Sequence, residues 1–271
     1  MYFYCIFRSN LPVFFRYFVI WVLFLVASSL VCLSFVSLNI EHHTRPIPPP
    51  FPITRGKRGM CALTFDGDYH ANLADDILRI LREKNVKATF FLTGRFMKLY
   101  PEVVKRIVEE GHEVGNHTTH HPHLTEFEKT RRQKTLPGVT PGFLYDELYE
   151  TERIFMKLTG KPIARLWRAP YGEENREIVN WTRRLGYWEI RWTYDTIDWL
   201  DDTLSPKYMT SKEMLEFLLS RDLSGSIILM HVGSLRKKDF PTEMLPELID
   251  SLRARGIEPV PVSTLLGLEE W

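Results

Sequence analysis

Six ionisable side chains of the kinds used in acid–base and metal chemistry follow short apolar stretches at separate places in the chain. They are Asp66, His117, His121, Arg168, Asp198 and His231. In such a set Asp66 could act as general base on a water molecule, and His231 as general acid to a leaving group. One charged residue after a strand means little, but six at successive strand ends predict a single reactive rim.

Two of the histidines have the spacing of metal ligands. His117 and His121 lie four residues apart in NHTTHHPHL, so one helical turn would bring both rings to the same side. Two imidazoles suit Zn²⁺ or a similar divalent ion, with further ligands from elsewhere in the chain. His120 and His123 neighbour the pair, which leaves open which two histidines bind the metal.

The elements that must position these residues alternate along the chain. Apolar or β-branched runs predict strands at 60–65, 87–93, 113–116, 166–169, 189–194, 226–231 and 258–260. Helical spacing predicts helices at 73–84, 101–110, 143–158, 173–185, 211–219, 242–255 and 263–268. This alternation indicates an α/β fold with a mainly parallel sheet, arranged like a barrel whose strand C-termini carry the chemistry. The polar, basic stretch 124–141 is expected to be a surface loop near the mouth of the barrel.

The N-terminal segment has the features of a membrane anchor. Residues 17–40 contain no charged side chain, and about 20 apolar residues suffice to cross a bilayer. Arg8 and Arg16 precede this run, which would keep that end cytoplasmic and place the rest of the chain outside the cytoplasm. We expect residues 1–40 to be an uncleaved anchor. A signal peptide cleaved near Ala27 and a buried core helix are the alternatives.

A proline-rich segment comes after the expected anchor. Residues 41–58 are rich in proline and basic residues, which favours an extended linker between the anchor and a domain at 59–271. The chain as a whole has 35 Lys and Arg against 34 Asp and Glu. This balance argues against a nucleic-acid partner, because such proteins normally carry a basic excess.

The order of the motifs resembles a known family. The sequence contains Thr-Phe-Asp at 64–66, His-Thr-Thr-His-His-Pro at 117–122, Arg-Ala-Pro-Tyr-Gly at 168–172, Asp-Trp at 198–199 and Leu-Met-His at 229–231. Together, over about residues 59–266, they resemble the polysaccharide deacetylase family, carbohydrate esterase family 4 with its NodB-homology domain. The resemblance implies a distorted (β/α) barrel and metal-dependent removal of acetyl groups from N-acetylated sugars in a polymer.

The resemblance also implies a role for each matching residue. The implied catalytic residues are Asp66 as base, Arg168 as the residue that orients it, His231 as general acid and Asp198 as the partner of His231. The implied metal ligands are His117 and His121, and the implied substrate-binding residues are Tyr171, Trp199 and Leu229, with Leu229 lining the pocket for the acetyl methyl group. Two alternatives stay open: a structural Arg168–Asp198 ion pair, and a His231 that is only a core residue.

One position departs from the family pattern. The family usually has Thr-Phe-Asp-Asp-Gly, in which the second Asp completes a metal triad, whereas this chain has Gly67 there and Asp68 next. The metal could be held by the two histidines, waters and Asp66, or Asp68 could reach it after a backbone shift, or metal affinity could be weak or lost. A subset of the family that deacetylates muramic acid in peptidoglycan also lacks the second Asp, which directs the expected substrate toward peptidoglycan.

The leading hypothesis is a membrane-anchored, metal-dependent N-deacetylase acting on an N-acetylated cell-wall glycan, with its catalytic domain in the bacterial periplasm or at the cell surface. A second hypothesis, motivated by Gly67, is a pseudoenzyme that binds glycan without turnover. A third is a small-molecule C–N hydrolase on the same fold. Retention of Asp66, Arg168, Asp198 and His231 argues for an enzyme, because a binding module needs no base, acid or tuning partners.

Overall fold

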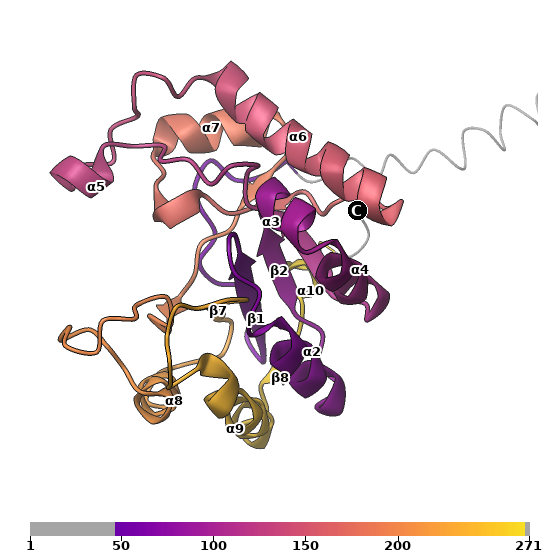
Figure 1. Cartoon of the computed structure of the whole chain (residues 1–271), viewed down its shortest axis with the longest axis vertical. Helices are drawn as coiled ribbons and strands as arrows, with labels where there is room; N and C mark the ends of the chain where they lie inside the picture. Colours follow the sequence, from indigo (N-terminus) through magenta and orange to yellow (C-terminus); the bar gives the residue numbers. More distant parts are fainter. Residues whose placement is uncertain (1–46, 269–271) are drawn as a thin grey trace, which may run out of the picture. The chain divides into compact units, whose positions relative to one another are not determined.

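The computed structural model describes residues 47–268, in which parallel strands alternate with helices (Figure 1). The strands are β1 (Met60–Gly67), β2 (Thr89–Leu92), β3 (Glu113–Asn116), β4 (Leu166–Trp167), β5 (Trp188–Glu189), β6 (Tyr194–Asp195), β7 (Ile227–His231) and β8 (Glu258–Pro259). The helices are α2 (Ala74–Glu83), α3 (Gly94–Leu99), α4 (Pro101–Glu109), α5 (Phe127–Thr130), α6 (Pro141–Thr159), the 3₁₀ turn η2 (Pro170–Gly172), α7 (Arg176–Arg184), α8 (Ser211–Leu219), α9 (Pro241–Ala254) and α10 (Val262–Leu266).

The sheet is a curled half-barrel. Its strand order is β5-β4-β3-β2-β1-β7-β6, with β8 paired to the start of β1, and the named strands pair in parallel. The prediction of a parallel α/β fold is confirmed. The closed arrangement is not formed by these strands, because β5 and β6 follow each other in the chain yet lie at opposite ends of the sheet order.

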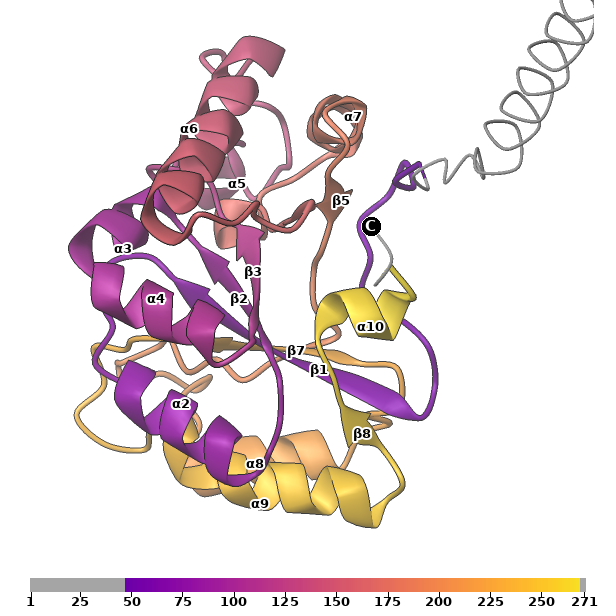
Figure 2. The ribbon, with the colours of Figure 1, turned by 90° about the vertical axis from the view of Figure 1, so that its right-hand side faces the viewer.

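The chain between β5 and β6 is bound by residues from elsewhere in the sequence. The sequence predicts one strand over 189–194, but the backbone oxygens of Ile190 and Arg191 accept hydrogen bonds from the Arg168 side chain at 3.0 and 3.2 Å. The segment before β1 contacts the chain on both sides of the break between β5 and β6. Ile53 forms a bridge with Ile190, just after β5, and Arg55 forms one with Ser226, just before β7. Figure 2 shows this segment running between β5 and α10.

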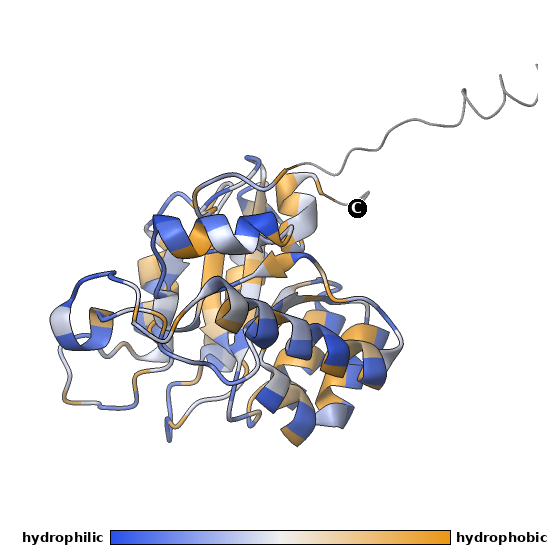
Figure 3. Ribbon diagram, turned by 90° about the horizontal axis from the view of Figure 1, so that it is seen from above, coloured by the Kyte–Doolittle hydropathy of each residue, from blue (hydrophilic) through white to orange (hydrophobic). Residues whose placement is uncertain are grey.

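Alternation along β1 separates the core from the site. Leu63 and Phe65 belong to the main apolar cluster, which helices α2, α4, α8 and α9 share with the outward face of the sheet. Thr64 and Asp66 therefore project to the opposite, concave face, because successive strand residues point to opposite sides. In Figure 3 the strands are partly orange, and the surrounding helices alternate between orange and blue. The same strand thus supplies both core and site residues.

Two helices depart from the expectation. The segment after β2, for which the sequence predicts no element, forms α3, because the Thr93 side chain accepts a hydrogen bond from the Phe96 amide at 2.9 Å and caps its first turn. Within the expected surface loop 124–141 lies the short helix α5. That loop closes on itself through a bridge between Thr125 and Thr135.

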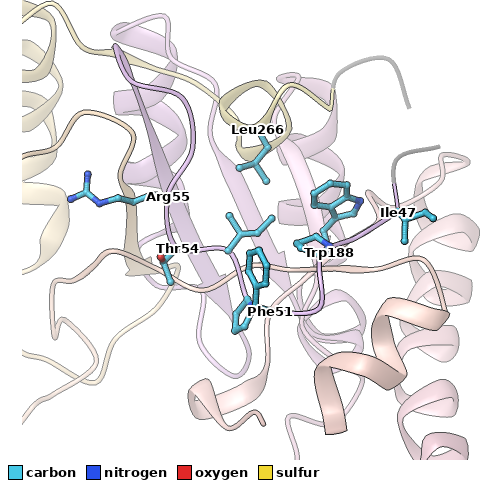
Figure 4. A pocket seen from close by; sticks show the side chains of 9 residues that line it. Ile47, Phe51, Thr54, Arg55, Trp188 and Leu266 are labelled. Atoms are coloured by element: carbon cyan, nitrogen blue, oxygen red, sulfur yellow. The ribbon is translucent and has the colours of Figure 1, made fainter. Parts of the chain in front are cut away.

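The N-terminal side of the domain carries an apolar groove. The compact unit begins at Ile47, so residues 47–58, expected in a linker, pack against the domain. A groove of about 480 Å³ lies here, lined in part by Ile47, Phe51, Trp188 and Leu266 (Figure 4). Between residues 47 and 268 no helix is long and apolar enough to cross a membrane. The expected anchor at 17–40 lies outside the described residues.

Candidate active site

Adjacent strand ends bring together the two residues expected to act as base and acid. Asp66 on β1 and His231 on β7 are register partners in the parallel sheet, although 165 residues separate them in sequence. The Asp66 side chain is almost buried, whereas the His231 side chain keeps about a quarter of its surface exposed. The two side chains therefore lie side by side at the C-terminal edge of the sheet, the edge where barrels of parallel strands carry their active sites.

A buried arginine holds the Asp66 carboxylate. The Arg168 guanidinium is fully buried and donates hydrogen bonds to Asp66 Oδ1 at 2.6 Å, Thr64 Oγ1 at 3.0 Å and the backbone oxygens of Ile190 and Arg191. Burial lowers its pKa, and the Asp66 charge opposes that shift. Arg168 thus pairs with Asp66 and not with Asp198, and leaves the second oxygen of Asp66 free to face the site.

A second carboxylate holds His231. Asp198 is fully buried, and its Oδ1 lies 2.8 Å from His231 Nδ1 while its Oδ2 accepts the His231 backbone amide at 2.9 Å. Burial by itself would lower the pKa of His231, but the charge and hydrogen bond of Asp198 dominate and raise it to about 9. The imidazole is therefore protonated at neutral pH, with its Nε2 proton available to a leaving group.

His117 and His121 lie together beside Asp66. Their ring centres are 4.8 Å apart, and His117 Nε2 lies 3.7 Å from Asp66 Oδ2. His117 Nδ1 is 2.8 Å from the Arg168 backbone oxygen, which can only accept, so the Nε2 lone pair faces the site. Burial lowers the pKa of His117; burial and the neighbouring His117 lower that of His121 to about 3. Both rings are thus neutral at pH 7, as metal binding requires.

The structure distinguishes this pair from its two neighbours. His120 Nδ1 lies 2.7 Å from Glu147 Oε1, and His123 Nδ1 lies 2.9 Å from Glu173 Oε1. Both rings are thus held by buried glutamates, whereas His117 and His121 lie against each other and His117 lies next to Asp66.

Sequence reasoning missed these two glutamates. Glu147 also accepts the Thr119 and His120 amides, and Glu173 accepts the Leu124 and Thr125 amides. Together they hold the loop that carries the histidines. A signal was present for Glu147, because it lies on the buried face of the helix expected at 143–158, where an acidic residue needs partners.

The described residues provide only part of a metal site. A Cβ added to Gly67 would lie 2.7 Å from Leu92 Cδ2 and 3.2 Å from the Phe96 ring, so it would enter the apolar core. Asp68 Oδ2 lies 3.8 Å from His121 Nδ1, but both Asp68 oxygens bind Arg95. Among residues 47–268 no three His, Cys, Asp or Glu side chains gather as metal ligands. The donor set is two neutral imidazoles without a third protein ligand.

The three expected substrate-binding residues lie around the same edge. Tyr171, with φ +59°, is over half exposed and stacks on the His123 ring at 4.0 Å. Trp199 is half exposed, and its Nε1 donates to Asp195 Oδ2 at 3.3 Å. Leu229 is buried two positions before His231 on β7, so both side chains lie on the same face of the sheet.

Comparison with known sequences shows the family. A sequence profile described as polysaccharide deacetylase matches residues 54–190, about half of the chain. This chain belongs to the polysaccharide deacetylase family. Among family members, the peptidoglycan-N-acetylmuramic acid deacetylase PdaA of Bacillus subtilis is 32% identical over 72% of this chain and 66% of its own length. A peptidoglycan-N-acetylglucosamine deacetylase of Bacillus cereus is 30% identical over 72% of this chain. The chain spans slightly less than two thirds of these relatives.

Solved structures of the family include both active and inactive members. The Bacillus subtilis PdaA structure matches with a TM-score of 0.67 and 28% identity, covering 82% of this chain and 87% of that one. A pseudoenzyme of carbohydrate esterase family 4 from Bacillus anthracis matches with a TM-score of 0.68 and 29% identity, covering 81% and 70%. The fold and the family are shared, while similarity in fold does not separate a catalyst from a binding protein.

Proposed function

We propose that this protein is a hydrolase that removes N-acetyl groups from amino sugars of a cell-wall polysaccharide, with peptidoglycan as the substrate. The observation that carries the proposal is the pairing of Asp66, held by Arg168, with His231, held by Asp198, on adjacent strand ends. The names of the relatives support peptidoglycan as the polymer.

The geometry supports a two-step hydrolysis. Asp66 Oδ2 takes a proton from a water molecule while the water oxygen bonds to the acetyl carbonyl carbon and the carbonyl π electrons move onto the carbonyl oxygen. His231 Nε2 then gives its proton to the amide nitrogen as the carbonyl double bond re-forms and the C–N bond breaks, which leaves acetic acid, ionised to acetate at neutral pH, and the free amine of the sugar. Leu229 would contact the acetyl methyl group, and Tyr171 and Trp199 the sugar. In the presence of a divalent ion such as Zn²⁺, His117 and His121 are the residues that would hold it, and its chemistry would be to polarise water and carbonyl oxygen.

The proposal is tested by acetate release from N-acetylated peptidoglycan fragments, measured with chelator and with added Zn²⁺. Asp66→Asn should lower the rate on the order of 10²–10⁴-fold, the usual contribution of a general base. Asp76→Asn, a surface change on α2, is the control and should leave the rate unchanged. An Asp66→Asn variant as active as the wild type would contradict the assigned base.

A glycan-binding pseudoenzyme is the second candidate. The specific observation in its favour is the incomplete ligand set, with Gly67 unable to supply a carboxylate and Asp68 bound to Arg95. It predicts that the wild-type protein binds peptidoglycan fragments but releases no acetate with any added metal. Measuring binding and acetate release on the same fragments separates the two candidates.

We propose that residues 17–40 anchor the protein in the membrane with the catalytic domain outside the cytoplasm. Arg8 and Arg16 support this orientation. Only six residues separate the apolar run from Ile47 in the sequence. Carbonate washing of membranes should leave the protein in the pellet. Release by the wash, or protection of the domain from external protease, would contradict this proposal.

A further inference from the structure

The third ligand is not simply missing at Gly67. Strand alternation directs position 67 to the face opposite that of Asp66, and a Cβ there would meet Leu92 and Phe96, both in the main apolar cluster. A carboxylate placed on this backbone would therefore be directed into the core rather than toward the histidines.

Two carboxylates lie close to the histidines, Asp66 beside His117 and Asp68 beside His121, and since Asp66 is assigned as the base, Asp68 is the one left to take that role. Its Oδ2 is 3.8 Å from His121 Nδ1. Two ligands of a tetrahedral Zn²⁺, each about 2.0–2.2 Å from the ion, lie roughly 3.4 Å apart. The separation in the structure is close to this value, so a small side-chain movement would be enough for Asp68 and His121 to share an ion.

Arg95 holds Asp68 in a different arrangement. Its guanidinium contacts Asp68 Oδ1 at 3.0 and 2.6 Å and Asp68 Oδ2 at 2.5 Å, and Thr93 Oγ1 adds a contact to Oδ1 at 3.2 Å. Such two-pronged pairs are among the stronger hydrogen-bonded contacts in proteins. Every Asp68 oxygen that could bind a metal is engaged by a cation, which would also repel a metal ion at the histidines.

The Asp68–Arg95 pair is nevertheless able to open. About a third of the Arg95 side chain and a quarter of the Asp68 side chain are exposed. Arg95 stands in the first turn of α3, and its guanidinium lies over the exposed Tyr69 ring at 5.1 Å. The pair therefore borders solvent, where the guanidinium can rotate away without unfolding the sheet.

We propose that Arg95 withholds Asp68 from the His117–His121 pair, so that Asp68 is a third metal ligand available only when the Arg95 contact is broken. The inference rests on the proposed function in that it takes these two histidines as the metal pair. It explains the incomplete donor set by a competing ion pair. Metal affinity is then set by Arg95, a residue that is not itself a ligand.

The test is a cobalt titration of the full-length chain after removal of bound metal with chelator. Affinity is measured by calorimetry, and ligation by the visible absorption of bound Co²⁺. Arg95→Gln should tighten binding by about tenfold or more, the scale of effects from residues next to metal ligands. Adding Asp68→Asn to Arg95→Gln should remove that gain. Arg79→Gln is the matched control, because Arg79 is also paired with acidic side chains, Asp76 and Glu83, but lies on α2 away from the site.

The titration also separates direct ligation from a general charge effect. Loss of repulsion alone would tighten binding without changing the ligands, so the Co²⁺ absorption of Arg95→Gln would then match that of the wild type. With Asp68 as a new ligand, the Co²⁺ absorption of Arg95→Gln should differ from that of both the wild type and the double variant. Equal affinity in Arg95→Gln and Arg79→Gln, a gain that survives Asp68→Asn, or a Co²⁺ absorption unchanged from the wild type would each overturn the proposal. Since no substrate is present, the result is independent of acetate release.

Discussion

At the scale of single residues, the site depends on what each ionisable group is bonded to. Arg168 fixes the Asp66 carboxylate, and Asp198 keeps His231 protonated. The two strand ends thus present a proton acceptor beside a proton donor at neutral pH. This pairing, rather than the presence of any one residue, is what the proposed hydrolysis requires.

The pH dependence should follow His231. Because Asp198 raises its pKa to about 9, the rate of acetate release should fall as the pH rises through about 9. Folded His231 binds its proton more tightly than the unfolded residue, so its contribution to stability is full below its ordinary pKa of about 6.5 and is lost as the pH rises through about 9. Asp198→Asn leaves burial to dominate, which should move the alkaline limit to lower pH. Rate–pH profiles check this, with the exposed Asp201→Asn as control.

A side chain at position 67 should lower the stability of the fold. Gly67→Asp places atoms against Leu92 and Phe96. It should destabilise the fold by about 1–3 kcal/mol, the usual cost of overpacking a core. Urea denaturation measures this cost. Gly138→Asp is the control, because a Cβ there meets nothing within 4 Å. A stable Gly67→Asp protein that binds Co²⁺ more tightly than the wild type would show that the missing ligand is at 67 after all.

At the scale of elements, the site loops are held by buried side chains from other parts of the chain. Ile197, a β-branched residue with φ +57°, precedes Asp198. The Arg236 guanidinium donates a hydrogen bond to the Ile197 backbone oxygen at 2.9 Å. The same guanidinium donates to the backbone oxygens of Met209 and Asp239. Arg236 is therefore a positioning residue for the loop that carries Asp198.

Loss of Arg236 should move the loop without removing a catalytic group. Arg236→Met keeps most of the side-chain volume but leaves three backbone oxygens without their donor, which should cost roughly 3 kcal/mol or more. The alkaline limit of activity should shift to lower pH as Asp198 loosens its hold on His231. Denaturation and rate–pH profiles test both effects, with Arg221→Met on the surface as control. A loss of stability with an unchanged pH profile would leave Arg236 a purely structural residue.

At the scale of the whole molecule, the described domain begins earlier than the proline pattern indicates. Ile53 packs against an apolar cluster that includes Phe91, Ile190 and Leu265, and its backbone bonds to β5 and to Arg191. The segment around Ile53 thus covers the break between the two ends of the sheet. The prolines of this segment suggest a linker in the sequence. In the structure they belong to an extended segment that packs on the domain.

A chain that starts at residue 59 should therefore be less stable than one that starts at residue 47. The loss should be at least about 2 kcal/mol, the ordinary contribution of one large apolar side chain in a core. Thermal unfolding of the two chains measures it, and Ile53→Ala in the longer chain should account for part of the difference. Equal melting temperatures would mean that the segment only rests on the surface.

Local pattern was sufficient to predict most of the strands and helices and the positions of the site residues. Apolar runs, helix-ending glycines and ordered motifs depend on near neighbours in sequence, and β3 and α8 have the predicted bounds. The break between β5 and β6 could not be predicted, because it depends on hydrogen bonds from Arg168, more than 20 residues away.

The order of the motifs along the chain was therefore enough to indicate the family. It also indicated which ionisable side chains gather, because the C-terminal ends of parallel strands lie at one edge of the sheet. Which partner each charge takes was decided only by the folded chain. Burial and the distances between side chains on different elements pair Asp66 with Arg168, His231 with Asp198, and Asp68 with Arg95. These pairings join residues 27 to 102 positions apart in the sequence. Electrostatic energy depends on separation in space rather than along the chain.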